Sequence, residues 1–282
     1  HDDDFYLNHD LFVSDAWIRE LFEILELYNF TIDENTTYDG DLSIDPEMLG
    51  RIFENLLAEI NPETGESARK STGSYYTPRN IVEYMVDESI LEYLLIRSDI
   101  EKSKLSALVS YDLTDDLESP LSEEEKQKVV DLLEKVKILD PACGSGAFPM
   151  GALQKIVFIL QQIDPEGHLW FKKQIMKTSP EVRRILEKEF NNKNFDYVRK
   201  LGIIRENIYG VDIQPVATEI SRLRCFLTLV VDQAIDENEK NRGIYPLPNL
   251  DFKFVCANTL VASPDSNWGT LGLDNGFQEE FS

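Results

Sequence analysis

This sequence of 282 residues has little positive charge. It contains 28 lysines and arginines against 52 aspartates and glutamates, a formal net charge of -24, and its sequence pI is about 4.4. Proteins that hold DNA neutralise its phosphates with lysine and arginine, so extensive phosphate contact by this stretch is disfavoured. If the protein serves a nucleic acid, we expect the main basic surface to lie on another part of the polypeptide.

Cysteine is scarce as well, and long apolar runs are absent. Cys143, Cys225 and Cys256 are far apart and lack the spacing of metal ligands. We therefore expect no metal site and interpret them as reduced thiols of a cytoplasmic protein. No apolar run approaches the roughly 20 residues that span a bilayer, and no signal peptide is recognisable, so we expect no membrane partner.

The first part of the chain carries the periodicity of amphipathic helices. Apolar residues recur at helical spacing over 15–30 and 43–60, which predicts a helical N-terminal region over residues 1–70. A loop rich in Gly, Ser, Thr and Pro follows, and a further helix is predicted over 79–95. The polar, acidic stretch 99–125 is typical of an irregular segment with some helix.

Strands and helices alternate further along the chain. Short apolar stretches at 136–142, 207–213 and 252–258 predict three buried strands. Helices are predicted between them over 146–160 and 215–231, with a helical insertion at about 161–205. Alternation of this kind is typical of an α/β fold with a parallel, doubly wound sheet, and we expect residues 71–282 to form one domain.

A glycine-rich turn, "ILDPACGSGAF", follows the first predicted strand. In doubly wound sheets, ligands bind beyond the carboxyl ends of the strands, so this turn is the natural place for a ligand. Gly144 and Gly146 let the backbone turn sharply and approach a ligand closely. The turn lacks the Gly-Lys-Ser/Thr of a phosphate-binding loop, and Pro149 stands where the dinucleotide fingerprint needs a third glycine. S-adenosylmethionine fits, because it contains a ribose, an adenine and a charged amino acid end but no pyrophosphate.

The end of the second predicted strand supplies a test of this interpretation. A nucleoside cofactor needs a carboxylate there to accept hydrogen bonds from the ribose hydroxyls. Asp212 holds that position, and the apolar Ile213 follows it. The structural alternative is that Asp212 only caps the next helix. Together with the glycine turn, the cofactor interpretation is favoured.

These motifs, in this order, resemble those of DNA adenine-N6 methyltransferases of restriction–modification systems. The glycine turn and the upstream element "STGSYYTPRN" carry the resemblance, and "NIYGVDIQPVATEISRLRCFLTL" and "LPNLDFKFVCANTL" are similar to the next two motifs. Type IIG methylases are the most similar group, and the modification subunits of type I systems come next. The resemblance covers roughly residues 45–260 and implies a partial Rossmann-like methyltransferase sheet, preceded by a helical subdomain.

The resemblance also implies a set of cofactor-binding residues. Asp140 and the backbone of the glycine turn would face the methionine end, the Tyr-Thr-Pro element would close over it, and Asp212 would bind the ribose. Ile213 would lie against adenine, and Asn258 beside the adenine edge, where many relatives carry Asp. For the Tyr-Thr-Pro element the structural alternative is a loop before a helix, with Thr77 as N-cap and Pro78 at the first helical position. The full set of implied residues is Tyr76, Thr77, Pro78, Asp140, Pro141, Ala142, Gly144, Gly146, Phe148, Asp212, Ile213 and Asn258.

One part of the family pattern has no counterpart in this sequence. These enzymes flip the target adenine into a pocket, and their signature is Asn or Asp, then Pro-Pro, then Tyr or Phe. No such tetrapeptide occurs here, so we expect the cofactor half of a methyltransferase without catalytic residues, and no activity from this stretch alone. We expect double-stranded DNA to be held mostly by regions outside it, together with a restriction or specificity domain or subunit. Two alternatives stay open: a methyltransferase of another class, such as one acting on protein glutamine, and a degenerate module that only binds a partner.

Overall fold

The computed structural model describes residues 77–110, 120–233, 244–245, 250 and 252–261, all within one compact unit of the chain. The predicted helical region over 1–70 and the predicted site residue Tyr76 lie outside the described residues.

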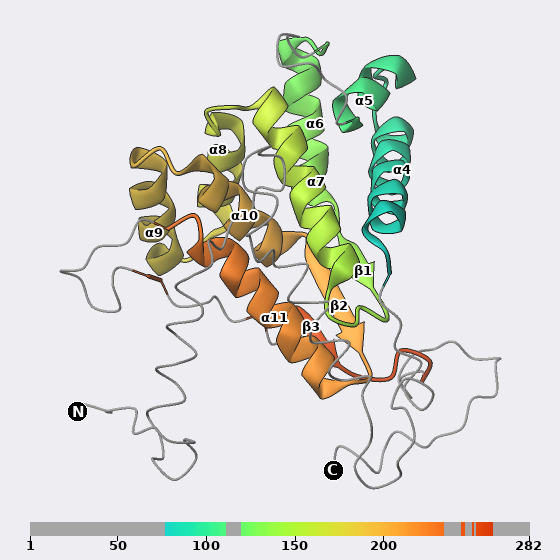
Figure 1. The fold of residues 1–282 in the computed structure, drawn as a ribbon. Helices are drawn as coiled ribbons and strands as arrows, with labels where there is room; N and C mark the ends of the chain where they lie inside the picture. The colour runs from blue at the N-terminus through green and yellow to red at the C-terminus, as the bar shows by residue number, and fades with distance from the viewer. Residues whose placement is uncertain (1–76, 111–119, 234–243, 246–249, 251, 262–282) are drawn as a thin grey trace, which may run out of the picture. The chain divides into compact units, whose positions relative to one another are not determined.

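The described elements follow one another as strands separated by helices (Figure 1). They are α4 (Arg79–Arg97), α5 (Lys102–Val109), α6 (Glu123–Lys135), β1 (Ile138–Asp140), α7 (Ala147–Ile163), α8 (His168–Lys177), α9 (Pro180–Asn191), α10 (Phe195–Glu206), β2 (Ile208–Asp212), α11 (Pro215–Val230) and β3 (Phe254–Cys256). The three predicted strands and the helices predicted between them are confirmed. Helices α8, α9 and α10 occupy the stretch that was predicted as a helical insertion.

The helix starts follow local sequence signals. Ser122 caps α6 in a capping box with Glu125, and proline occupies the first turn of both α9 and α11. At α4 the predicted start at Arg79 is confirmed, but the structural alternative for the Tyr-Thr-Pro element was wrong by one residue, because Pro78 is the N-cap and not the first helical residue. Pro78 has a ψ of 143°, and its extended backbone leaves its own carbonyl to accept the first helical hydrogen bonds, from Ile81 and Val82. Thr77 therefore does not cap the helix.

The three strands form a parallel sheet in the order β1-β2-β3. Ile138 pairs with Ile208, and Gly210 pairs with Phe254. Both crossovers run in the same direction along the sheet, and right-handed crossovers of that kind place their helices on the same face. In agreement with this, α7 contacts β1 and β2, whereas α11 contacts β2 and β3.

The two faces of the sheet differ in burial, which corrects the expectation of strands buried on both sides. Ile208 and Phe254 point toward the helices and are 0% and 1% exposed, whereas Leu139 and Val255 on the opposite face are 60% and 37% exposed. A doubly wound sheet needs a reversal of strand order, and the described strands contain none. The described part of the chain is therefore an α/β unit wound on one face.

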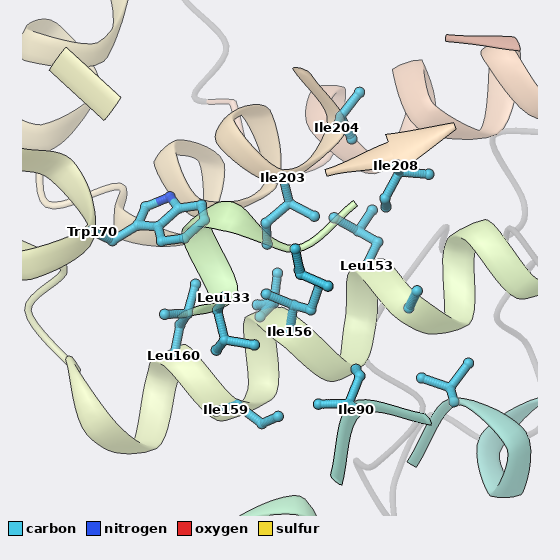
Figure 2. Close-up of a cluster of buried hydrophobic side chains, with 14 of the residues drawn as sticks. Ile90, Leu133, Leu153, Ile156, Ile159, Leu160, Trp170, Ile203, Ile204 and Ile208 are labelled. Atoms are coloured by element: carbon cyan, nitrogen blue, oxygen red, sulfur yellow. The ribbon is translucent and has the colours of Figure 1, made fainter. Parts of the chain in front are cut away.

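The main core lies between α7 and the helices around it (Figure 2). Ile156 and Leu160 of α7 pack with Leu133 of α6, Trp170 of α8 and Ile203 of α10, and each of these side chains is fully buried. The apolar positions of α7 recur around most of its circumference, which is typical of a central helix. This core holds the helical insertion against the helix that follows the glycine turn.

Candidate functional site

The carboxyl ends of the three strands meet at one edge of the sheet, and the predicted residues gather there. Asp140 ends β1, Asp212 ends β2, and Cys256 ends β3 in register with Asp212. Backbone hydrogen bonds extend the contact past the strand ends. The N–H of Cys143 donates to the carbonyl of Val211, and the N–H of Ala257 donates to the carbonyl of Asp212, both at 2.9 Å. The segments after β1 and β3 are thus both attached to the end of β2.

The glycine turn has the backbone that its sequence predicts. Gly144 and Gly146 have φ angles of 54° and 90°. These lie in the left-handed region, which residues other than glycine adopt only at a cost in free energy. Gly146 also leaves no room for a side chain, because an added Cβ would lie 2.9 Å from the Oγ of Ser221. The helix α7 begins directly after this turn and has no side-chain cap. Its first-turn N–H groups therefore lie at the same edge as the strand-end carboxylates.

Asp212 is held by two backbone donors. Its Oδ2 accepts from the N–H of Gly144 at 2.9 Å, and its Oδ1 accepts from the N–H of Gln214 at 2.8 Å. Gln214 is the N-cap of α11, so Asp212 does not have the capping role of the structural alternative. The second bond closes a local turn before the helix, whereas the first joins the carboxylate to the glycine turn. A carboxylate oxygen has two lone pairs, so each of these oxygens retains capacity for a further donor.

Asp140 is the polar group at this edge with an unsatisfied atom. Its Oδ1 accepts from the N–H of Ala142 at 3.0 Å, but its Oδ2 is buried and has no hydrogen-bond partner. Burial raises the pKa of this carboxyl group, the Ala142 N–H lowers it, and the neighbouring charge of Asp212 raises it further. A buried carboxylate oxygen without a partner is costly, and a cationic or N–H group placed beside it would remove that cost.

The segment after β3 lies over the start of the glycine turn. The hydroxyl of Thr259 donates to the carbonyl of Pro141 at 3.1 Å, which places the predicted residue Asn258 at the same edge. The Oδ1 of Asn258 accepts from the N–H of Leu260 at 3.0 Å. Ile213 is 58% exposed, and the Sγ of Cys256 lies 3.5 Å from its carbonyl oxygen. An exposed isoleucine beside the strand ends offers a flat apolar surface to a ligand.

Helix α4 brings Thr77 and Pro78 toward the same edge. Val82 of α4 packs on Gly151 of α7 so closely that a Cβ there would lie 2.6 Å from a Val82 methyl carbon. One turn further on, Asp87 pairs with the buried Lys155 at 2.9 Å. From the first contact to the second, the residue numbers increase in both helices. Helices α4 and α7 therefore run in the same direction and begin at the same end (Figure 1).

The sequence reasoning missed several groups that support this site. Thr259 was not singled out, and neither were Ser221 and Arg224 of α11, whose side chains donate to carbonyls of the glycine turn at 3.0 and 2.9 Å. The available signal was the presence of polar residues inside an otherwise apolar helix. The predicted residue Phe148 is half-buried and packs against the hydrophobic core.

The described ranges contain neither a candidate metal site nor a helix that could span a membrane. No group of three or more His, Cys, Asp and Glu residues there could hold a metal ion. In the same part of the chain, every helix is too short or too polar to cross a membrane.

Comparison with known proteins gives one informative similarity. The chain is 30% identical, over 270 residues, to a protein of Methanocaldococcus jannaschii that carries the provisional name of type II restriction enzyme and methyltransferase. The similarity covers 91% of this chain and 20% of that protein, so the chain spans about a fifth of its relative's length. No family model and no solved structure matches the chain.

Proposed function

We propose that this chain is the S-adenosylmethionine-binding part of a DNA adenine-N6 methyltransferase of a restriction–modification system. The observation that carries the proposal is the hydrogen bond from the Gly144 N–H to the Asp212 carboxylate. It joins the glycine turn to the candidate ribose acceptor at the edge where α/β sheets bind their ligands. The provisional name of the M. jannaschii relative supports a methyltransferase associated with restriction.

Each end of the cofactor has a matching group at this edge. The unpartnered Oδ2 of Asp140 would accept from the amino group of the methionine end, next to the backbone of the glycine turn. Asp212 would accept from the ribose hydroxyls, and the exposed Ile213 would lie against the adenine ring. The side-chain amide of Asn258 would lie beside the adenine edge, while Thr77 and Pro78 at the start of α4 would approach the methionine end.

The cofactor supplies an activated methyl group on a sulfonium, and the residues of this chain bind and orient it. The two strand-end carboxylates place negative charge near a ligand that carries positive charge on both its amino group and its sulfur, which favours binding. The catalytic tetrapeptide of the family does not occur in the sequence. We therefore assign the flipping of the target adenine, and most contacts with double-stranded DNA, to other regions. A restriction or specificity domain or subunit would cooperate with those regions. For the protein as a whole we propose a cytoplasmic location.

Calorimetric titration with S-adenosylhomocysteine, the demethylated product, tests the proposed binding site. Asp212→Ala removes the ribose acceptor and leaves the hydroxyls poorly paired, so we expect a loss of about 1–3 kcal/mol in binding free energy. Asp131→Ala is the control, because Asp131 lies on α6 and pairs with Lys173. Unchanged affinity in Asp212→Ala would refute the assignment of Asp212, and no binding by the wild-type chain would refute the proposed function.

Methyl transfer gives a separate test of the division of labour. The 282-residue chain, mixed with unmethylated DNA and radiolabelled S-adenosylmethionine, should transfer no methyl groups above background. Clear incorporation would show that adenine methylation does not need the missing tetrapeptide.

A further inference from the structure

Helix α11 forms the support on which the glycine turn rests. Ser221 and Arg224 lie one turn apart on this helix and are 0% and 4% exposed. The hydroxyl of Ser221 donates to the carbonyl of Gly144 at 3.0 Å, and Nη1 of Arg224 donates to the carbonyl of Ser145 at 2.9 Å. Two successive carbonyls of the turn are therefore held by side chains that lie 77 and 79 positions further along the chain.

Close packing adds a third contact at the same place. A Cβ on Gly146 would lie 2.9 Å from the Oγ of Ser221 and 3.3 Å from its Cβ. The backbone of the turn thus lies directly on the side chain of Ser221. Any movement of Ser221 toward the turn, or loss of its hydroxyl, changes the surface on which Gly146 rests.

The two hydrogen bonds fix the orientation of peptide groups that glycine leaves free. A trans peptide is planar, so a carbonyl that points to α11 turns the N–H of the same peptide to the opposite side. Gly144 and Gly146 both have positive φ angles, and glycine backbones have wide conformational freedom. The donors on α11 therefore select one orientation of the turn before any ligand arrives.

The support also links the turn to the candidate ribose acceptor. Helix α11 begins directly after β2, whose last residue, Asp212, accepts from the N–H of Gly144. The turn is thus attached to the β2–α11 unit through both its N–H and carbonyl groups. A change at Ser221 or Arg224 would move the turn relative to Asp212, whose place at the end of β2 and whose hydrogen bond from the Gln214 N–H do not depend on the turn.

We propose that Ser221 and Arg224 are positioning residues that set the glycine turn for the amino acid end of the cofactor. This inference rests on the proposed function, in which the turn faces that end of S-adenosylmethionine. It predicts that their loss weakens recognition of the amino acid end selectively, because the ribose acceptor and the adenine surface lie on β2 and after it.

Two ligands separate this selective effect from a general loss of structure. S-adenosylhomocysteine has both ends, whereas methylthioadenosine has the adenine and ribose without the amino acid. For Arg224→Met we expect calorimetry to show a loss of affinity for S-adenosylhomocysteine on the order of tenfold, the size of effect that one hydrogen bond to the ligand carries, with methylthioadenosine affinity unchanged. Ser221→Ala should act in the same direction, and Arg224→Lys, which keeps a cationic donor, should retain more affinity than Arg224→Met.

Arg199 provides a matched control. It is also a buried arginine that donates to backbone carbonyls, those of Asp164 and Pro165, but it lies in the helical insertion. Arg199→Met should lower the melting temperature and leave both affinities unchanged.

The outcomes distinguish the two proposals. If the wild-type chain binds neither ligand, the proposed function fails and this inference fails with it. If the wild-type chain binds both, and the Arg224 and Ser221 variants weaken both equally or neither, only the positioning role is overturned. If Arg224→Met does not fold, the same comparison made with Arg224→Lys and Ser221→Ala decides the matter.

Discussion

The two faces of the sheet consist of the same three strands but have opposite surroundings. On the packed face, Ile208 and Phe254 are almost completely buried beneath α7, α10 and α11. On the open face, Leu139 and Val255 are largely exposed, and Tyr209 lies between Lys137 and Lys253, with the Lys253 Nζ 3.7 Å from its ring centroid. The difference arises because both crossovers are wound in one direction.

The packed face is also the face that builds the site. Helices α7 and α11, which bury Ile208 and Phe254, both begin at the carboxyl ends of the strands and carry the chain back across the packed face (Figure 1). Helix α11 then supports the glycine turn from beneath through Ser221 and Arg224. The same two helices therefore bury the packed face and build the candidate site. Substitutions on the two faces should differ in their effects on stability and on ligand binding.

The largest expected effect is on stability. Phe254→Ala removes a fully buried aromatic side chain between β3 and α11 and should lower the free energy of unfolding by about 3–5 kcal/mol. Leu139→Ala, on the open face, should change it by only about 0.5 kcal/mol, as surface substitutions do. Urea denaturation of both variants measures the difference. Equal losses would mean that the open face is covered in solution.

The sequence predicted where the strands lie better than it predicted which of their faces is buried. The apolar stretches predicted three strands correctly, but a short apolar run does not reveal whether one face or both are buried. Lys137 and Lys253 gave a signal, because they alternate with Ile138 and Phe254 and so share a face with Leu139 and Val255.

The candidate site was predictable for those residues that directly follow a predicted strand. The glycine turn, Asp140 and Asp212 follow predicted strands directly, and parallel strands bring their carboxyl ends together. Ser221, Arg224 and Thr259 act on backbone carbonyls far away in the chain. Such contacts depend on the packing angle of a helix or the path of a loop, which local patterns do not specify.

Asp140 pairs with Gly210 and ends β1 in the register of the packed face, and burial raises its pKa above the ordinary value of 3.8. The folded chain therefore holds the proton more tightly than the unfolded chain. Its free energy of unfolding should fall as the pH rises from 3.8 through the raised pKa.

Asp140→Asn keeps the acceptor for the Ala142 N–H and removes the charge. Compared with the wild type, it should be more stable at neutral pH, and the difference should vanish at pH values below 3.8. Under the proposed function it should also bind S-adenosylhomocysteine more weakly, so stability and affinity would change in opposite directions. A variant that is less stable at neutral pH and equally stable in acid would show that the buried charge is not costly.

The smallest perturbation uses the three cysteines as reporters of the same difference. Cys143 and Cys225 are buried on the packed side, and burial raises the pKa of each thiol to about 12. Cys256 is exposed at the strand ends, beside Ile213. Because alkylation requires the thiolate, iodoacetamide at pH 8 should label Cys256 and spare the other two, as mass spectrometry of peptides would show. Urea-unfolded chain, in which all three should react, is the control.

Saturating S-adenosylhomocysteine should slow the labelling of Cys256, since the adenine would lie against Ile213. Rapid labelling of Cys143 or Cys225 in the native chain would contradict a closed packed face, and unaltered labelling of Cys256 with bound ligand would contradict an adenine position beside β3.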